Sequence, residues 1–267
     1  MVMTNDPAPA EMTPHGVPAT VLPPDALAEI AALALRLRRA NGPVIGALNA
    51  LGGLMEARAT ALPAGLRRLI ETGTVEILEG AYQIAGRVGT HSALPETGDW
   101  GHRVAAATGG ALGGAGGLGT ALVELPATVT LFFAAMQKVA ARHGFDPASQ
   151  ETRAMCLEIF GSGGPLASDD GVNTSFLGTR LAVNGTSVQA LIRQVAPTLA
   201  AVIGRKLASQ AVPVIGAAAG AGVNYTFLSY YQEMAHVRFG LKRLAERYGA
   251  ERVDLAFRDD LRRLGAG

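Results

Sequence analysis

The chain is poor in charged residues, in aromatics and in cysteine, and each shortage excludes a class of protein. Charged residues make up 17 % of the 267 residues and aromatics 5 %, whereas an ordinary soluble domain carries about 25 % charged residues. The formal net charge is +1 and no basic block is present, so we expect no nucleic-acid partner. The single cysteine, Cys156, excludes an internal disulfide and a cysteine-based metal site.

Residues 1–24 also lack the features of a secretory signal peptide. They contain no basic N-terminal segment and no apolar run, and they carry prolines at positions 7, 9, 14, 18, 23 and 24. This composition predicts a disordered, proline-rich lead-in. We therefore expect a cytoplasmic protein, and a reducing compartment agrees with the lone cysteine.

Two long stretches stand out because they are almost free of charge and rich in glycine and alanine. Residues 104–137 contain one charged residue, Glu124, and residues 207–232 contain none. Runs of this length normally suggest a membrane span. In residues 104–123, however, the strongly apolar side chains contribute only roughly −1.5 to −3 kcal/mol to insertion, and each glycine costs a helix about 1 kcal/mol relative to alanine.

Small residues four apart in these stretches, such as Gly109/Gly113/Gly117 and Gly216/Gly220, allow two helices to approach closely. This favours a pair of helices buried in the protein or lying at an interface. Insertion into the bilayer is the second interpretation, and a flexible glycine loop is the third.

Helical periodicity and capping residues dominate the rest of the chain, and no segment alternates with the period of a strand. Asp25 is expected to cap a helix that reaches residue 40, Pro63 to begin another, and Pro126 to precede a helix through Met136. Asp146 and Pro147 predict the start of a helix through Phe160. Residues 213–240 predict a long apolar helix, and residues 250–264 a charged one. The fold class is all-α, a multi-helix bundle with two glycine/alanine-rich apolar helical segments.

Several polar residues in the apolar segments are candidates for function. Glu124 stands two residues before Pro126, where a helix N-terminus would favour its charge. Asn224 needs a hydrogen-bond partner, which we expect on another helix. Glu233 and His236 form one Glu-x-x-His motif, half of a di-iron bundle site, and no second copy occurs. A metal-binding enzyme is therefore the alternative hypothesis, with the ligands Glu124, Glu151, Glu158, Glu233 and His236.

Several short sequence segments occur in a specific order: Leu48–Gly53 with Leu62 and Pro63, Ala81 and Tyr82 before Gly89, the glycine-rich stretch into Glu124–Pro126, Glu151–Arg153 with Cys156–Glu158, Val212–Gly216 with Asn224, and Gln232–Arg243 with Leu244. Together they resemble the EcsC family of bacterial proteins, which was first named for a third gene beside a two-component ABC exporter. The resemblance covers roughly residues 30–250 and agrees with a single helical domain over residues 25–264, in which the polar loop at residues 90–100 is a candidate hinge. It carries over no established biochemical activity, and we expect no catalytic residue and no cofactor. It implies a shared polar cluster at Glu124, Glu151, Asn224 and His236.

The leading functional hypothesis is a non-catalytic helical protein at the cytoplasmic face of the membrane. Its partner would be membrane lipid or a membrane protein, including components of an ABC transporter, and association would be peripheral, with integral insertion as the alternative. Four basic residues follow the second apolar stretch, and such residues favour anionic lipid surfaces: Arg238, Lys242, Arg243 and Arg247. A homo-oligomer in which the glycine faces meet between subunits is a third hypothesis.

Overall fold

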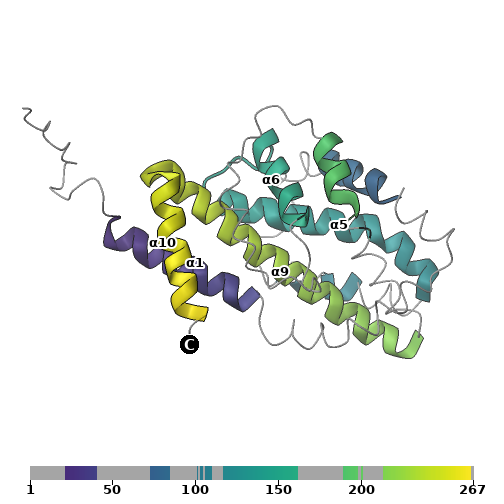
Figure 1. Ribbon diagram of the computed structural model, residues 1–267. Helices are drawn as coiled ribbons and strands as arrows, with labels where there is room; N and C mark the ends of the chain where they lie inside the picture. The colour runs from purple at the N-terminus through teal and green to yellow at the C-terminus, as the bar shows by residue number, and fades with distance from the viewer. Residues whose placement is uncertain are drawn as a thin grey trace, which may run out of the picture.

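The computed structural model describes residues 22–40, 73–84, 101, 103–104, 106–109, 117–161, 189–197, 200 and 213–265. Five long helices organise this part of the chain (Figure 1): α1 (Pro24–Ala40), α5 (Gly117–Arg142), α6 (Gln150–Gly161), α9 (Pro213–Tyr248) and α10 (Ala250–Gly265). Further helical segments cover residues 73–84 and 189–197. The described residues contain no strand, so the all-α prediction is confirmed.

Helix α9 is the element on which the others pack, and α5 runs beside it in the same direction (Figure 1). Ring contacts fix the register of this parallel pair. Phe132 near the middle of α5 lies 5.7 Å from Tyr231, and Phe145, just past the end of α5, lies 5.5 Å from Phe239. Helices α5 and α9 therefore begin at the same end of the molecule.

Helix α1 crosses the C-terminal half of α9 in the opposite direction. Arg36 contacts Glu233, and Glu29 contacts Arg243, so residue numbers rise along α1 as they fall along α9. The face of α1 that is buried repeats at helical spacing, with Ala26, Ile30, Leu33, Ala34 and Leu37 pointing into the core. This repeat explains both the helix and the side that it presents to α9.

Glycines with positive φ end the two central helices and set the direction of the chain beyond them. Gly144 has φ +88° after α5, where its amide donates to Ala141 and the amide of Phe145 donates to Ala140. This pair of bonds is a Schellman cap, which needs a left-handed residue. Gly249, with φ +91°, separates α9 from α10, and α10 then packs across α1 and α9 (Figure 1).

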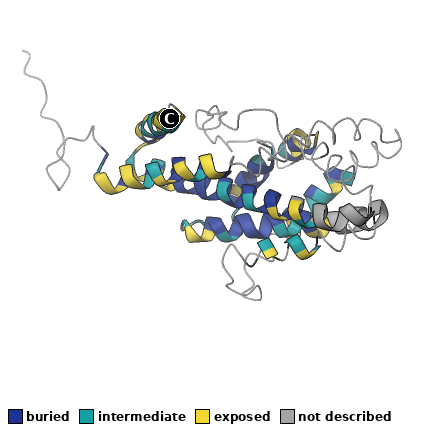
Figure 2. Ribbon diagram, turned by 90° about the horizontal axis from the view of Figure 1, so that it is seen from below, coloured by how far each residue is buried: buried dark blue, intermediate teal, exposed yellow. Residues whose placement is uncertain are grey.

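Apolar and aromatic side chains fill the space between α5, α6 and α9. The Phe160 ring lies 4.6 Å from that of Tyr231 and 4.8 Å from that of Phe133, and all three side chains are buried. Figure 2 shows the buried residues concentrated along these central helices. Cys156 of α6 is fully buried in the same core, and burial raises the pKa of its thiol far above the usual range.

Two helix starts differ from the sequence prediction. Pro126 lies inside α5, which begins at Gly117, so the glycine-rich residues 117–125 are helical. Glu124 is therefore well inside α5 and does not cap a helix N-terminus, which corrects the capping prediction. Helix α6 begins at Gln150, where the Ser149 hydroxyl accepts the amide of Thr152 at 3.1 Å. Asp146 instead closes a local turn by accepting the amide of Ala148.

The other helix boundaries agree with the sequence within a few residues, except that α9 continues eight residues past the expected end at Gly240, to Tyr248. The expected hinge at residues 90–100, the lead-in up to residue 21 and the start of the Pro63 helix lie outside the described residues. Among the residues that the structure describes, no helix combines the length and apolar character needed to cross a membrane.

Gly240 allows the close contact between α1 and α9, and we predict that a methyl group at this position destabilises the fold. A Cβ on Gly240 would lie 2.9 Å from both Leu33 methyl carbons, whereas a Cβ on Gly222 of the same helix would meet nothing within 4 Å. Gly240→Ala should lower the free energy of unfolding by a net ~1 kcal/mol, because an overpacking cost of about 1–3 kcal/mol exceeds the helix-propensity gain of about 1 kcal/mol. Gly222→Ala should raise it by about 0.5–1 kcal/mol through helix propensity. Urea unfolding of both variants measures this, and equal effects would contradict the assigned contact.

Candidate functional site

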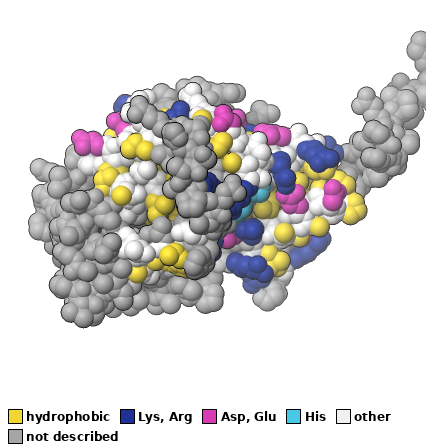
Figure 3. All heavy atoms as spheres, turned by 180° about the vertical axis from the view of Figure 1, so that it is seen from behind, with side chains coloured by type: hydrophobic (Ala, Val, Ile, Leu, Met, Phe, Trp, Pro, Cys, Tyr) yellow, Lys and Arg dark blue, Asp and Glu magenta, His cyan; other side chains and the backbone are white. Residues whose placement is uncertain are grey.

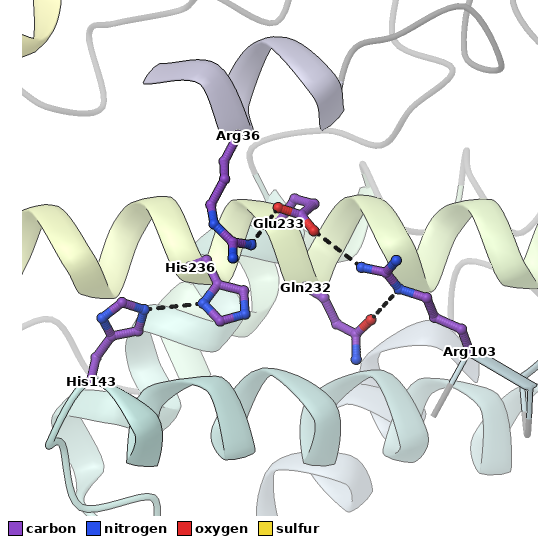
Figure 4. Close-up of polar contacts among 6 residues, drawn as sticks. All are labelled: Arg36, Arg103, His143, Gln232, Glu233 and His236. Carbon is purple, nitrogen blue, oxygen red and sulfur yellow. Dashed lines mark hydrogen bonds and ion pairs between the residues drawn. The ribbon is translucent and has the colours of Figure 1, made fainter. Parts of the chain in front are cut away.

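Most of the polar side chains that join the helices lie along the C-terminal half of α9, from Gln232 onward. The first 20 residues of α9, Pro213–Gln232, contain no charged residue, and the charges begin at Glu233. Partners reach this half of α9 from α1, from α6, from the end of α5 and from Arg103. We call this row of contacts, shown in part in Figure 4, the polar seam.

A pair of histidines joins the end of α5 to α9. Nε2 of His143 lies 3.1 Å from Nδ1 of His236, and the two rings meet edge to face (Figure 4). His143 is the last residue before Gly144, so the Schellman cap of α5 holds it in place. His236 is 8 % exposed. One ring nitrogen of this contact must donate and the other accept, which requires that at least one imidazole is neutral.

The surroundings of His143 keep it uncharged at neutral pH. Burial, the neighbouring His236 and the guanidinium groups of Arg243, Arg36 and Arg142 together lower the pKa of His143 to about 4. Burial is the largest of these causes. His143 therefore lies in a positive electrostatic environment and gains its proton only in acid.

Glu233 links two segments of the chain that are far apart in sequence. One of its carboxylate oxygens accepts a hydrogen bond from Arg36 of α1 at 2.8 Å, and the other accepts one from Arg103 at 3.1 Å. Arg103 also donates from Nε to the side-chain oxygen of Gln232 at 2.8 Å. Both oxygens of Glu233 are thus used for structure, with two guanidinium groups sharing one negative charge (Figure 4).

Further along α9, two basic side chains bind to carboxylates of α6. Arg238, 8 % exposed, lies 3.6 Å from Glu158. Burial lowers the pKa of Arg238 to about 10, although Glu158 opposes that change, and burial raises the pKa of Glu158. Lys242 contacts Glu151 at 2.8 Å and Glu246 at 2.7 Å. Burial alone would lower the pKa of Lys242, but these two carboxylates raise it.

These ion pairs change the interpretation of the basic group on α9. Arg238, Lys242 and Arg243 are each paired with a carboxylate of the same chain, and Arg247 lies over the ring of its neighbour Tyr248 at 5.3 Å. Charges that are neutralised within the fold attract an anionic surface weakly. This group therefore gives little support to lipid binding.

The residues of the expected polar cluster lie at different places. The side-chain amide of Asn224 donates to the carbonyl oxygen of Ala106 at 3.1 Å, the interhelical hydrogen bond that we expected. His236 lies twelve residues further along α9, or about 18 Å at the rise of an α-helix. Glu151 lies at the start of α6 beside Lys242. The side chain of Glu124 lies outside the described residues.

The described residues that were considered as metal ligands make ion pairs or a histidine contact instead. Its described carboxylates, Glu151, Glu158 and Glu233, each contact a basic residue, and His236 contacts a second histidine. Among the described residues, no group of three or more side chains is arranged to hold a metal ion. The structure thus gives the metal hypothesis no geometric support in the part of the chain that it describes.

Sequence reasoning did not single out His143, Arg36 or Arg103, which are three of the six residues drawn in Figure 4. A signal existed for His143, because His143–Gly144 ends a helical pattern and basic residues are favoured at that position. The two arginines have no comparable signal, since their distances to Glu233 along the chain are 197 and 130 residues.

Comparison with known protein families identifies the family of the chain. The model of the EcsC protein family matches residues 92–244, which is more than half of the chain and includes all of α5, α6 and most of α9. No curated protein and no solved structure matches the chain.

The lowered pKa of His143 predicts a stability that falls in acid. The ordinary value of 6.5 applies to the unfolded chain and about 4 to the folded one, so the unfolded chain binds the proton first as the pH falls. Stability is complete above pH 6.5 and is lost down to about pH 4. The loss should be on the order of 1–2 kcal/mol, because solvent screens this half-buried ring. Chemical unfolding at several pH values should show this slope, and His143→Gln should flatten it; an unchanged slope would contradict the assignment.

The shared carboxylate of Glu233 predicts a second stability effect. Glu233→Gln leaves Arg36 and Arg103 without their common negative charge and should destabilise the fold by about 1–3 kcal/mol. Glu246→Gln is the matched control on the same helix. Its ion pair is exposed and Lys242 keeps Glu151, so the change should stay within about 0.5 kcal/mol. Thermal unfolding of the two variants distinguishes them, and a larger loss for the control would refute the assigned role.

Proposed function

Because the chain belongs to the EcsC protein family, we propose that it is a non-catalytic helical protein of the cytoplasmic face of the membrane. It associates there with the bilayer or with a membrane transport protein, such as an ABC transporter component. The contact is made by the end of the molecule at which α5 and α9 both begin. We call this the uncharged end.

The parallel register of α5 and α9 is the observation that supports this proposal. Residues 213–232 of α9 carry no charge, and Gly117–Met136 of α5 carries one, Glu124. Because the two helices start together, these two charge-poor halves lie side by side at one end. An antiparallel pair would have placed them at opposite ends. Among the residues that the structure describes, the α5–α9 pair therefore has a charge-poor end and a charged end.

Exposed residues that precede Phe132 and Tyr231 by about one and a half helical turns agree with a docking role. Tyr225 of α9 is 39 % exposed, and Pro126 and Ala127 of α5 are also exposed. A tyrosine with an accessible ring suits the boundary between water and an apolar phase, because its ring is apolar and its hydroxyl is polar.

The opposite end carries the charges. The last helix, α10, has an exposed face on which arginines and aspartates form ion pairs. The polar seam occupies the adjoining half of α9. Such a surface remains favourably solvated. The contrast between the ends predicts an orientation in which α10 points away from the membrane.

Vesicle flotation with matched charge insertions tests this orientation. Tyr225→Glu and Ala127→Glu place a carboxylate at the uncharged end, where burial against lipid costs a few kcal/mol, so binding should fall roughly tenfold or more. Leu255→Glu is the control, since Leu255 is 58 % exposed on α10 and should bind as the unaltered protein does. Circular dichroism checks that each variant is folded. Equal loss in all three variants would contradict the proposed end.

Cell fractionation separates the two classes of partner. Recovery in the membrane fraction without flotation on protein-free vesicles assigns the contact to a membrane protein, and flotation assigns it to lipid. Recovery wholly in the soluble fraction at low salt, with no flotation, refutes the proposal. A solution mass that is a multiple of 27.4 kDa, and that Tyr225→Glu reduces to the single chain, would instead assign the uncharged end to contact between copies.

A further inference from the structure

Helix α1 has apolar side chains on the side that faces away from the core as well as on the buried side. Leu27 and Leu35 are 40 % and 41 % exposed, and Ala28 and Ala32 between them are also exposed. With the half-buried Ala31, these residues repeat at steps of three and four, which places them on one side of a helix. We call this side the outer face of α1.

The outer face carries no charge along its middle, because the charged residues of that part of α1 are directed toward α9. Glu29 contacts Arg243, and Arg36 contacts Glu233. Figure 3 shows hydrophobic side chains in yellow among charged ones on the side of the molecule where α1 lies. A surface helix normally has polar residues opposite its buried side, so a second apolar side indicates contact with another molecule.

Opposite charges stand at the two ends of the outer face. Asp25 in the first turn and Arg39 in the last turn are both exposed, and in the described part of the chain neither makes a hydrogen bond or an ion pair. Asp25 precedes Ala32 by seven residues, and Arg39 follows it by seven. Because seven residues are almost two turns, with a drift of ~20° per step, the three positions form one line along the outer face.

This line is complementary to an antiparallel copy of itself. With a two-fold axis beside Ala32, Asp25 of one copy lies opposite Arg39 of the other, and the same pair repeats at the far end. The small side chain of Ala32 allows the two helices to approach closely at the axis. A parallel arrangement would instead place like charges together. The net charge of +1 adds little repulsion between copies.

We propose that the outer face of α1 binds the outer face of a second copy of the chain in an antiparallel, two-fold symmetric dimer. Leu27 and Leu35 then lose contact with water, and Asp25 and Arg39 pair across the interface. This interface differs from the glycine faces considered from the sequence. Because α1 crosses the charged half of α9, both uncharged ends stay free, and the dimer is independent of the proposed function.

The expected dimer is weak and reversible. One helix of 17 residues from each chain forms a contact smaller than the standard interface of about 1,600 Å². We therefore expect a dissociation constant on the order of 10–100 μM. Sedimentation of the full chain over a range of concentrations should show a mass that rises from 27.4 kDa toward twice that value. A single-chain mass at roughly 500 μM, well above this constant, overturns the proposal.

A carboxylate at the two-fold axis tests the assigned face. Ala32→Glu brings two carboxylates of the dimer face to face, which should weaken association about tenfold or more, because like charges opposed in an interface cost free energy. Ile84→Glu is the matched control, since Ile84 is 45 % exposed in the helical segment 73–84, and its dimer should be unchanged. Circular dichroism checks that both variants are folded. Equal weakening in both variants, or none in Ala32→Glu, contradicts the proposed face.

Charge reversal tests the antiparallel register. Asp25→Arg and Arg39→Asp should each weaken association several-fold, because each places like charges opposite one another at both ends of the dimer. The double variant restores the pairs with their signs exchanged and should recover most of the affinity. A role of these charges only in stabilising the ends of α1 predicts the reverse, since the double variant opposes the helix dipole most strongly. A double variant as weak as either single one, or weaker, refutes the register.

Tyr225→Glu separates this interface from the uncharged end. The change lies outside α1 and should leave the dimer intact. A dimer that Tyr225→Glu dissociates and Ala32→Glu does not belongs to the uncharged end and overturns this proposal. The two proposals therefore fail separately, because vesicle binding depends on Tyr225 and association in solution depends on Ala32.

Discussion

The close crossing of α1 over α9 at Gly240 is the contact on which the polar seam depends. The missing side chain lets Leu33 and His143 reach the backbone of α9. From this point, helical spacing places Arg243 one turn away on one side and His236 one turn away on the other. The same crossing orients α1 so that Arg36 meets Glu233 and Glu29 meets Arg243. The close approach at Gly240 therefore goes together with the positions of the charged side chains on α1 and α9.

The charges of the seam remain partly buried because almost all of them are paired. A half-buried carboxylate such as Glu233 would be costly alone, and the two guanidinium groups that it binds remove that cost. The seam also sets the protonation of one of its rings. Burial first, and then the neighbouring His236 and guanidinium groups, lower the pKa of His143 to about 4 and keep the ring neutral at neutral pH.

The sequence was sufficient for the features that depend on local periodicity. The apolar repeat of α1, the long apolar helix at Pro213 and the all-α class follow from side-chain spacing. Pro126 was misread, because a proline at a helix start and one tolerated within a helix share the same local signal. Ser149 was missed because Asp146 and Pro147 present an equally good cap three residues earlier.

The candidate site was harder to predict, for a physical reason. The partner of Asn224 was rightly expected on another helix, since a buried amide must be satisfied. The choice of partners for Glu233 and His236 depends instead on how α1 and α5 lie against α9, which no short motif specifies. The Glu-x-x-His spacing indicated that both residues share a face of α9, but it could not show that an arginine and a histidine, rather than a metal, would meet them.

The lone cysteine of the chain has a consequence for its chemistry. Cys156 is fully buried in the apolar core, and its burial disfavours the thiolate, which is the form that reacts with oxidants and attacks disulfides. The folded chain thus has no readily oxidised thiol among the residues that the structure describes, and Cys156 enters redox chemistry only when α6 separates from the core. Oxidation of the thiol would therefore follow unfolding rather than precede it.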